Sequence, residues 1–393
     1  MILFFVTIIL PVAVGQHDNF IHQTYVIPTE PASELTSHCL DKSNMTQCVT
    51  LNDLIDRDLG QIQEEVIFLS GKHVVNGTNR GRKYLFAKQS KDLLLRGESN
   101  NVTIICREEF FFLFVQVACI KISNLTLQNC SMNGNVTYEK TVYCCNHTFI
   151  FVGLESEVTL NNIQLTRNSK CGIDVHLKGD VTSSCASVQI TNTKLYTGVC
   201  IAHHNVYIAN KSMIEITNTT FDGSCIEIKA SPNSIHTELD VMIKNTSFRN
   251  YSHWSTLIFR GTSHPFTVTL HDVNVSDNRS PYMMYANQTT VHLQGNLNLF
   301  NHNRGVMYIV HSRLLFSRTK VKFVYNTVTS AQGVPVYAKN SFLVFEDSHV
   351  VFKKNHGSVC GGIVGNEKHS LCSQATQQLT LRIIKDNKVG HYH

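Results

Sequence analysis

Two carboxylates, Asp174 and Glu227, have the residue type and spacing that could do chemistry together in this chain. Each lies between apolar residues, in Ile173-Asp-Val175 and Ile226-Glu-Ile228, so each should point outward from a strand with a buried face. Their strands are two repeats apart, with Ala202 between them, which predicts a separation of roughly 9.5 Å from strand spacing. That value lies at the upper edge of the carboxyl separations of inverting glycosidases. The pair is the alternative catalytic site of a polysaccharide-cleaving enzyme.

Other features of the sequence argue against catalysis. The repeats after Glu227 place Ile258, Met284 and Met307 on the same predicted face, which indicates an apolar stripe without acids. The chain lacks the Asn-Thr-Asp, Asp-Asp and Gly-His-Gly set of polygalacturonase-like enzymes, and the Asp cluster with a basic Arg that lyases need. None of the 20 histidines has the His-Glu-x-x-His spacing of a zinc site. We therefore expect no catalytic residues, no metal, no cofactor and a non-enzymatic role.

The strands that carry these carboxylates belong to a repeated word, Val241-Met-Ile-Lys-Asn-Thr-Ser-Phe248, which recurs at 188–195 and 214–221. Its copies are spaced 23 to 30 residues apart when registered on the first apolar residue: Val158, Val188, Ile214, Val241, Val268, Val291, Leu314 and Leu343. A second strand signal follows a polar loop in each period, as in Leu257-Ile-Phe259. Three short strands per period, with few helical patterns, predict an all-β fold: a right-handed parallel β-helix solenoid.

An asparagine marks the corner between the two strands of the repeated word. Asn tolerates a left-handed backbone, and its amide can bond to the amide one coil away, which predicts a ladder. The ladder residues are Asn124, Asn162, Asn192, Asn218 and Asn245. Later coils carry Asp272, Gly295, Arg318 and Asp347 instead, so a looser corner is expected there. The alternative is an exposed turn asparagine with no inter-coil bond.

The ends of the chain divide it into three parts. Residues 1–15 predict a signal peptide, with an apolar core and the small-residue site Ala13-Val-Gly15; an N-terminal membrane anchor is the alternative. Residues 16–60 predict an irregular leader followed by a short N-terminal capping helix, indicated by helical spacing over 48–59. Residues 61–393 predict the β-helix, whose last coil is incomplete: 379–387 starts another coil and the chain stops soon after.

Four motifs near the start of the solenoid occur in a recognisable order. They are Phe68-Leu-Ser-Gly-Lys-His73, Leu93-Leu-Leu-Arg-Gly97, Val102-Thr-Ile-Ile-Cys106 and Asn124-Leu-Thr-Leu-Gln-Asn-Cys130. Over roughly residues 48–390, the chain resembles the secreted right-handed β-helix (pectin-lyase-like) proteins that occur in many copies in early-branching animals. The resemblance implies an extracellular β-helix and implies little about function, because that group is largely uncharacterised.

The 13 cysteines predict structural disulfides, since no Cys-x-x-Cys motif suggests zinc or redox chemistry. The candidate pairs are Cys39 with Cys48, Cys106 with Cys130, Cys119 with Cys144, Cys171 with Cys185, Cys200 with Cys225, and Cys360 with Cys372. Cys145 is not included in these six pairs. It is adjacent to Cys144, and it could take the place of Cys144 in the pair with Cys119.

Asn-x-Ser/Thr sequons are dense enough to support a glycosylated extracellular protein. The glycosylation candidates are Asn44, Asn76, Asn101, Asn129, Asn135, Asn146, Asn210, Asn250, Asn274 and Asn287. Three ladder residues, Asn124, Asn218 and Asn245, also lie in sequons but are expected to be poor acceptors. The sequon Asn278-Arg-Ser280 is weakened by the proline that follows it.

The charge and hydropathy of the chain limit the classes of partner that we expect it to bind. The formal net charge is +5, and Lys and Arg are spread without a long run, so we expect no nucleic-acid partner. Beyond the N-terminus no apolar segment reaches the roughly 20 residues of a membrane-spanning helix. The sequence thus predicts a secreted glycoprotein whose β-helix surface recognises an extracellular glycan or protein. A polysaccharide-cleaving enzyme and a purely structural assembly role are the alternatives.

Overall fold

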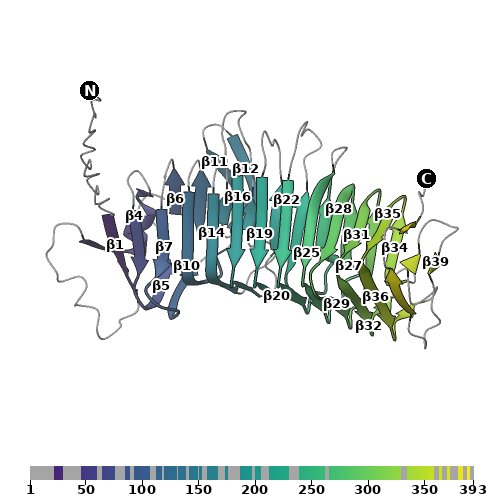
Figure 1. The fold of residues 1–393 in the computed structure, drawn as a ribbon. Helices are drawn as coiled ribbons and strands as arrows, with labels where there is room; N and C mark the ends of the chain where they lie inside the picture. The colour runs from purple at the N-terminus through teal and green to yellow at the C-terminus, as the bar shows by residue number, and fades with distance from the viewer. Residues whose placement is uncertain are drawn as a thin grey trace, which may run out of the picture.

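The computed structural model confirms a parallel β-helix (Figure 1). It describes residues 22–29, 46–59, 64–75, 85–88, 93–106, 112–116, 119–130, 132–138, 141–148, 150–152, 157–166, 173–175, 186–196, 200–204, 212–229, 239–261, 265–328, 334–357, 363–364, 370–371, 379–383 and 387–389. The coils stack from the N-terminal end at the left of Figure 1 to the C-terminal end at the right, so residues one repeat apart become neighbours in space.

Each coil contributes one strand to each of three faces. The β22 sheet contains the first strand of the repeated word: β16 (Ala186–Thr191), β19 (Ser212–Thr217), β22 (Leu239–Lys244), β25 (Phe266–His271), β28 (Thr289–Gln294), β31 (Arg313–Ser317) and β35 (Phe342–Glu346). The β23 sheet contains the second: β17 (Lys194–Leu195), β20 (Thr220–Asp222), β23 (Ser247–Arg249), β26 (Asn274–Ser276), β29 (Asn298–Asn301), β32 (Lys320–Val324) and β36 (Ser348–Lys353). All these pairings are parallel, so a side chain keeps its face from coil to coil.

The β24 sheet is the third face, and it is formed by the strands that follow the polar loops. Its strands are β3 (Asp58–Leu59), β6 (Leu85–Lys88), β9 (Leu113–Gln116), β13 (Ile150–Val152), β15 (Ile173–Val175), β18 (Cys200–His204), β21 (Cys225–Lys229), β24 (Ser255–Arg260), β27 (Tyr282–Asn287), β30 (Val306–Val310), β34 (Val336–Lys339), β38 (Ile363–Val364) and β39 (Ser370–Leu371). This sheet runs the whole described length of the solenoid, and it carries both predicted carboxylates.

In the first half of the solenoid the strands of the other two faces are longer or paired differently. They are β4 (Glu64–Phe68), β5 (Gly71–Val75), β7 (Leu93–Gly97), β8 (Val102–Cys106), β10 (Cys119–Gln128) and β14 (Glu157–Thr166). Strand β10 pairs in parallel with β7 through its first half and with β8 through its second half, so it turns the corner between two faces. An antiparallel hairpin of β11 (Met132–Tyr138) and β12 (Thr141–Thr148) projects from this region.

Alternate residues of every coil fill the core, as the repeated word predicted. Val241 and Ile243 are 2% and 0% exposed, and the ring of Phe248 is completely buried. Aromatic rings one coil apart stack on each other inside: Phe221 on Phe248 with ring centroids 4.5 Å apart, and Phe300 on Phe323 at 4.9 Å. Burial of these side chains supplies the driving force that winds the chain, at about 25 cal/mol per Å² of apolar surface.

The corners of each coil use left-handed backbone geometry. The φ values are positive at Asn124, Asn162, Asn192, Asn218 and Asn245, and they stay positive at Asp272, Gly295, Arg318 and Asp347. Asn162 Nδ2 donates to Asn124 Oδ1 at 2.9 Å, and Asn218 Nδ2 donates to Asn192 Oδ1 at 3.5 Å. Asn192 instead donates to Asn161 Oδ1 at 3.0 Å. The backbone turn therefore continues through all nine coils of this corner, whereas the amide-to-amide bonds are interrupted.

A second asparagine ladder, which sequence reasoning missed, lies inside the next corner. Asn278, Asn303, Asn326 and Asn355 are each at most 3% exposed. In each step the Nδ2 and backbone N–H of one residue donate to the Oδ1 of the next, at 2.9 to 3.2 Å. Each Nδ2 also donates to a backbone carbonyl of the preceding coil. This ladder, and not the first, is continuous and fully buried.

The N-terminal end differs from the irregular leader that was expected. Strand β1 (His22–Ile27) pairs in parallel with β2 (Thr46–Thr50) and β4, so a coil already begins there. Pro28 follows this strand and ends it, because proline has no N–H for a ladder. The short helix α2 (Leu51–Ile55) begins with a Thr50–Asp53 capping box and buries Leu51, Leu54 and Ile55 against the first coils. The predicted signal peptide lies outside the described residues.

The C-terminal strands differ from the further coil that was expected. The prediction is wrong in strand direction, because these strands run antiparallel to the strands with which they pair. Strand β40 (Leu379–Ile383) pairs antiparallel with β36, and β41 (Asn387–Val389) pairs antiparallel with β35. The segment therefore folds back along the last parallel strands and pairs with their backbone groups. Apolar alternation is the same for both directions, so the sequence pattern does not distinguish them.

One predicted disulfide is present with both partners described. Cys106 and Cys130 are bonded, with their Cα atoms 4.7 Å apart. Cys48 and Cys225 are also disulfide-bonded, and backbone register sets Cys200 opposite Cys225. The pairing of Cys119 with Cys144 stays a prediction. Five further candidates lie outside the described residues: Cys39, Cys171, Cys185, Cys360 and Cys372.

Candidate functional site

One outward row of the β24 sheet connects the predicted carboxylates with a set of tyrosines. Backbone register gives the order of this row from coil to coil: Asp174, Ala202, Glu227, Ile258, Tyr285, Tyr308 and Tyr337. The row runs parallel to the solenoid axis, with neighbours about one strand spacing, roughly 4.8 Å, apart. It therefore places residues far apart in sequence on a single line across the surface.

The carboxylate pair lies at the N-terminal part of this row. Ala202 separates Asp174 from Glu227, so their backbones are two strand spacings, roughly 9.6 Å, apart on the same face. The Glu227 side chain is 24% exposed, and its Oε1 lies 2.5 Å from the Nζ of Lys229. The side chain of Asp174 is outside the described part of the structure. A catalytic role for the pair stays a prediction.

The apolar stripe predicted beyond Glu227 is wrong at two of its three positions. Ile258 does occupy the outward row and is 5% exposed. Met284 and Met307, however, are completely buried, and Tyr285 and Tyr308 take the outward positions. The register shifts between Tyr282 and Met284, where an irregularity inserts an extra residue. Side chains alternate along a strand, so a shift of one residue exchanges the two faces.

The outward positions instead build an aromatic strip, which we define as Trp254, Tyr282, Tyr285, Tyr308 and Tyr337. The rings of Tyr285 and Tyr308 are nearly parallel, with centroids 5.8 Å apart, and those of Tyr308 and Tyr337 are 5.4 Å apart. These separations exceed the strand spacing of about 4.8 Å, so the rings are offset and part of each face remains uncovered. The strip spans four successive coils.

Trp254 lies at the N-terminal end of the aromatic strip. Its indole is 40% exposed and contacts the rings of Tyr282 and Tyr285, with centroids 5.2 and 4.9 Å apart. The guanidinium of Arg260 lies 4.9 Å from the indole centroid and 5.3 Å from that of Tyr285. A cation over the ring face fixes the orientation of both groups. The Arg260 guanidinium therefore contacts both Trp254 and Tyr285 of the strip.

The phenols of the strip influence each other. Burial, with the neighbouring phenols of Tyr337, Tyr282 and Tyr285 as further causes, raises the pKa of Tyr308 above its ordinary value. The hydroxyl of Tyr308 thus stays protonated across the physiological range and can both donate and accept hydrogen bonds. A row of phenol hydroxyls on partly exposed rings offers apolar contact and hydrogen bonding side by side.

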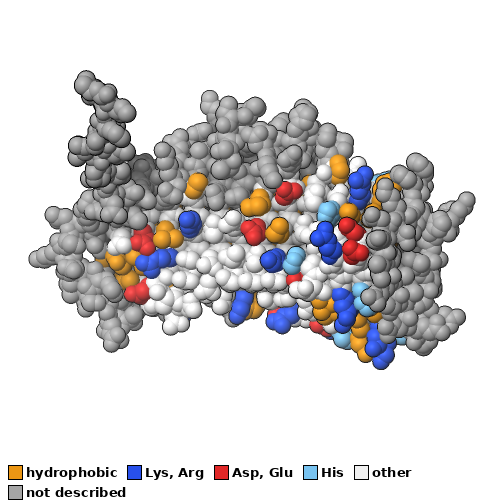
Figure 2. Space-filling view, viewed as in Figure 1, with side chains coloured by type: hydrophobic (Ala, Val, Ile, Leu, Met, Phe, Trp, Pro, Cys, Tyr) orange, Lys and Arg blue, Asp and Glu red, His pale blue; other side chains and the backbone are white. Residues whose placement is uncertain are grey.

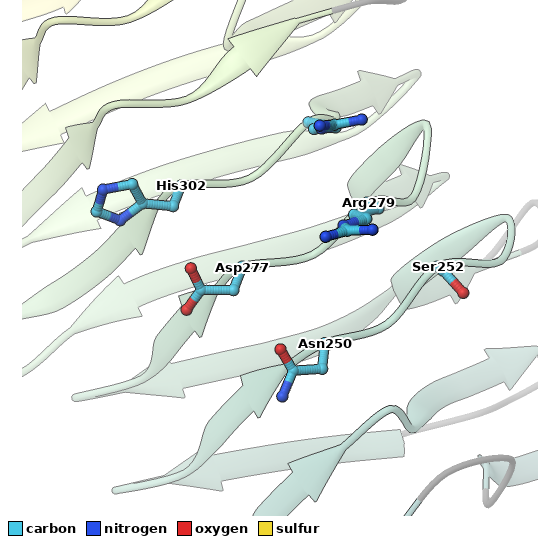
Figure 3. A pocket seen from close by; sticks show the side chains of 6 residues that line it. Asn250, Ser252, Asp277, Arg279 and His302 are labelled. Atoms are coloured by element: carbon cyan, nitrogen blue, oxygen red, sulfur yellow. The ribbon is translucent and has the colours of Figure 1, made fainter.

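A polar groove of about 600 Å³ lies beside the strip, at the corner where the β23 sheet gives way to the β24 sheet (Figure 3). It is lined by Asn250, Ser252, Asp277, Arg279, His302 and Arg304. All six are exposed, and they come from three successive coils. In Figure 3, Asn250, Asp277 and His302 point to one side of the turns, and Ser252 and Arg279 point to the other. The groove therefore follows the solenoid axis, as the strip does.

The turn geometry explains this placement. Asn250, Asp277 and His302 have positive φ at equivalent corner positions, and the residue after each turns inward. The inward residues include Asn278 and Asn303 of the buried ladder. The next residue, Ser252, Arg279 or Arg304, points outward again, because alternate residues change face. The buried asparagine ladder thus sets the spacing of the groove's two rows of side chains.

The remaining predicted site residues are distributed over the surface. Asn101, Asn129, Asn250 and Asn274 are exposed, and Asn287 is half-buried. Asn278 is fully buried, so its sequon is blocked by the ladder. Asn44, Asn76 and Asn210 lie outside the described residues, and the side chains of Asn135 and Asn146 are not described. Glycan occupancy stays a prediction.

The described ranges also bear on metal binding and membrane insertion. There, no group of three or more His, Cys, Asp or Glu side chains is arranged to hold a metal ion. Within the same ranges, no helix has the length and apolar character needed to cross a membrane.

Comparisons with known proteins give a distant structural similarity. No protein-family model matches the sequence, and no curated protein matches it. Among solved structures, the chain is similar to PfbA, a surface adhesin of Streptococcus pneumoniae, with a TM-score of 0.39 and 12% identity over 74% of this chain and 81% of that chain. A likeness this distant assigns no function, so the function has to be inferred from the site itself.

Proposed function

We propose that this protein is a non-enzymatic extracellular recognition module whose aromatic strip binds an extended polysaccharide. The observation that supports the proposal is the alignment of Tyr285, Tyr308 and Tyr337 at one register position of three successive coils. A site that repeats at a fixed pitch along one axis suits a ligand that repeats along its own axis. The disulfide between Cys106 and Cys130 is consistent with an oxidising, extracellular environment.

The chemistry of the strip favours a glycan over a protein. Offset rings leave part of each aromatic face for the apolar C–H face of a sugar ring, and the phenol hydroxyls can bond sugar hydroxyls. Polar residues line the adjacent groove. Protein interfaces instead have a broad buried centre surrounded by a polar rim. The strip is one side chain wide over most of its length, which gives no such centre.

A glycan array with plant, algal and animal polysaccharides, probed with the secreted protein, tests the proposal. Tyr308→Ala, at the middle of the strip, should abolish binding to any glycan that the native protein retains. Met242→Ala is the matched control, because Met242 is 41% exposed on a different face, the β22 sheet. Silence across the array, or glycan binding that Tyr308→Ala leaves unchanged, would overturn the proposal.

A polysaccharide-cleaving enzyme is the second candidate, and one observation favours it. Asp174 and Glu227 lie on the same outward row as the strip, so a chain bound along Tyr285 and Tyr308 would extend towards them. The test is the length of the bound polysaccharide after incubation, measured by size-exclusion chromatography. Shortening that Glu227→Gln prevents supports the enzyme. Unchanged chain length with intact binding supports the recognition module.

A further inference from the structure

We propose that the polar groove beside the strip recognises anionic groups, sulfate or carboxylate, carried by the polysaccharide. The inference rests on the proposed function and specifies its ligand class. It starts from the groove's charge: the lining residues include two guanidiniums, Arg279 and Arg304, and one acid, Asp277. Both arginines are exposed one coil apart at equivalent positions.

The arginines are held in register by the backbone. The Arg279 N–H donates to Tyr251 O at 2.7 Å, and the Arg304 N–H donates to Asn278 O at 2.8 Å. Their side chains therefore start about one strand spacing, roughly 4.8 Å, apart along the axis. A guanidinium presents a planar fork of donors that matches the oxygens of a carboxylate or sulfate. Two forks at this pitch suit anionic groups on neighbouring units of one polymer.

Positive charge continues along the same corner beyond the groove. The ring of His302 stacks on that of Tyr325, with centroids 5.1 Å apart and planes 6° from parallel. The Nζ of Lys354, in the next coil, lies 5.2 Å from the Tyr325 centroid and 3.3 Å from its hydroxyl. Figure 2 shows basic and histidine side chains gathered at this lower right end. The exposed basic residues of the neighbouring strands β32 and β36 include Lys320 and Lys353.

A cation is a poorer occupant of the groove. Asp277 is the one carboxylate among the lining residues, and oxygen-binding cations need several. The two guanidiniums would repel a metal ion. The groove's charge thus complements an anion, and Asp277 weakens rather than creates that preference.

The experiment uses three polymers of matched length that share one backbone: dextran, dextran sulfate and carboxymethyl dextran. Their Kd values for the full chain are measured by biolayer interferometry at low and physiological salt. We expect the sulfated or the carboxylated polymer, or both, to bind more tightly than dextran. The double variant Arg279→Gln, Arg304→Gln should weaken that binding by about tenfold or more, because charge-assisted hydrogen bonds are lost.

Two further variants separate site recognition from bulk attraction. Asp277→Asn should strengthen binding of the anionic polymer several-fold while fitting the same left-handed turn, which Asn tolerates. Lys121→Gln with Lys244→Gln removes the same charge from the β22 sheet and should change the Kd little. An equal loss from both double variants, or no preference for either anionic polymer over dextran, overturns the inference.

Failure of this inference can be told from failure of the proposed function. A neutral glycan whose binding requires Tyr308 but not Arg279 and Arg304 retains the recognition module and rejects the anionic ligand. Anionic binding that requires both arginines but survives Tyr308→Ala retains the groove and rejects the strip. The difference between dextran sulfate and carboxymethyl dextran identifies which anionic group the groove prefers.

Discussion

Replacing Asn303 with alanine tests whether the buried asparagine ladder stabilises the solenoid. Asn303 is completely buried, and its Oδ1 accepts from the backbone N–H of Asn278 at 3.2 Å and from Asn278 Nδ2 at 2.9 Å. Its own Nδ2 donates to Val275 O at 2.8 Å and to Asn326 Oδ1 at 3.1 Å. Alanine removes all four bonds without offering a replacement.

The expected loss follows from the groups left behind. The Asn278 N–H and the Val275 carbonyl each lose a partner in a region closed to water. A buried polar group without its partner costs about 1–3 kcal/mol, so Asn303→Ala should lower the free energy of unfolding by about 2–6 kcal/mol. That is comparable with the whole net stability of many domains.

Urea denaturation followed by circular dichroism measures the global effect, and hydrogen exchange of peptides covering Asn278 measures the local one. The amide of Asn278 should exchange faster, because its acceptor has gone. Asn274→Ala, an exposed substitution in the neighbouring coil that contains Asn278, is the control, with both proteins deglycosylated. Equal stability of the two variants, with unchanged exchange at Asn278, would refute the stabilising role of the ladder.

Two other predictions concern the N-terminal coils. Burial lowers the pKa of His73 below its ordinary value, so the unfolded chain takes up a proton first as the pH falls below about 6.5 and the folded state loses stability there. His73→Gln should therefore show a smaller stability loss between pH 7.5 and pH 5 in urea titrations; an equal loss in both proteins would contradict this. Replacing Cys106 and Cys130 with serine opens a disulfide with a sequence separation of 24 and should lower the free energy of unfolding by roughly 3–4 kcal/mol. A melting temperature unchanged from that of the oxidised native protein would show that this disulfide does not stabilise the fold.

The repeated word was sufficient to predict the architecture because burial and chain geometry both follow its period. Val241, Ile243 and Phe248 alternate with polar residues, and only a solenoid buries all such copies together. Corner geometry was also readable, since Asn and Gly favour a positive φ. Even Arg318 adopts it, and its N–H donates to Glu346 O in the next coil at 2.9 Å, which holds the turn.

The aromatic strip could not be predicted because its face depends on a single inserted residue. Met283-Met-Tyr285 has three large side chains in succession, and apolar character alone does not show which one faces inward. The buried ladder did leave a signal: Asn278, Asn303, Asn326 and Asn355 recur one residue after each turn. The alternation of apolar and polar residues is the same in parallel and antiparallel strands. It therefore gave no information on the direction of the C-terminal strands.

The corner between the β24 sheet and the β22 sheet changes length from coil to coil, and this has an evolutionary consequence. One residue, Gln288, joins β27 to β28, whereas residues 230–238 separate β21 from β22. The corner between the β22 and β23 sheets, by contrast, keeps one to three residues in every coil from β22 to β36. Insertions and deletions are thus tolerated along one edge of the solenoid. Such insertions and deletions do not change the spacing of the tyrosines and arginines from coil to coil on the adjoining surface. The protein can therefore vary its loops while the spacing of its recognition face stays the same.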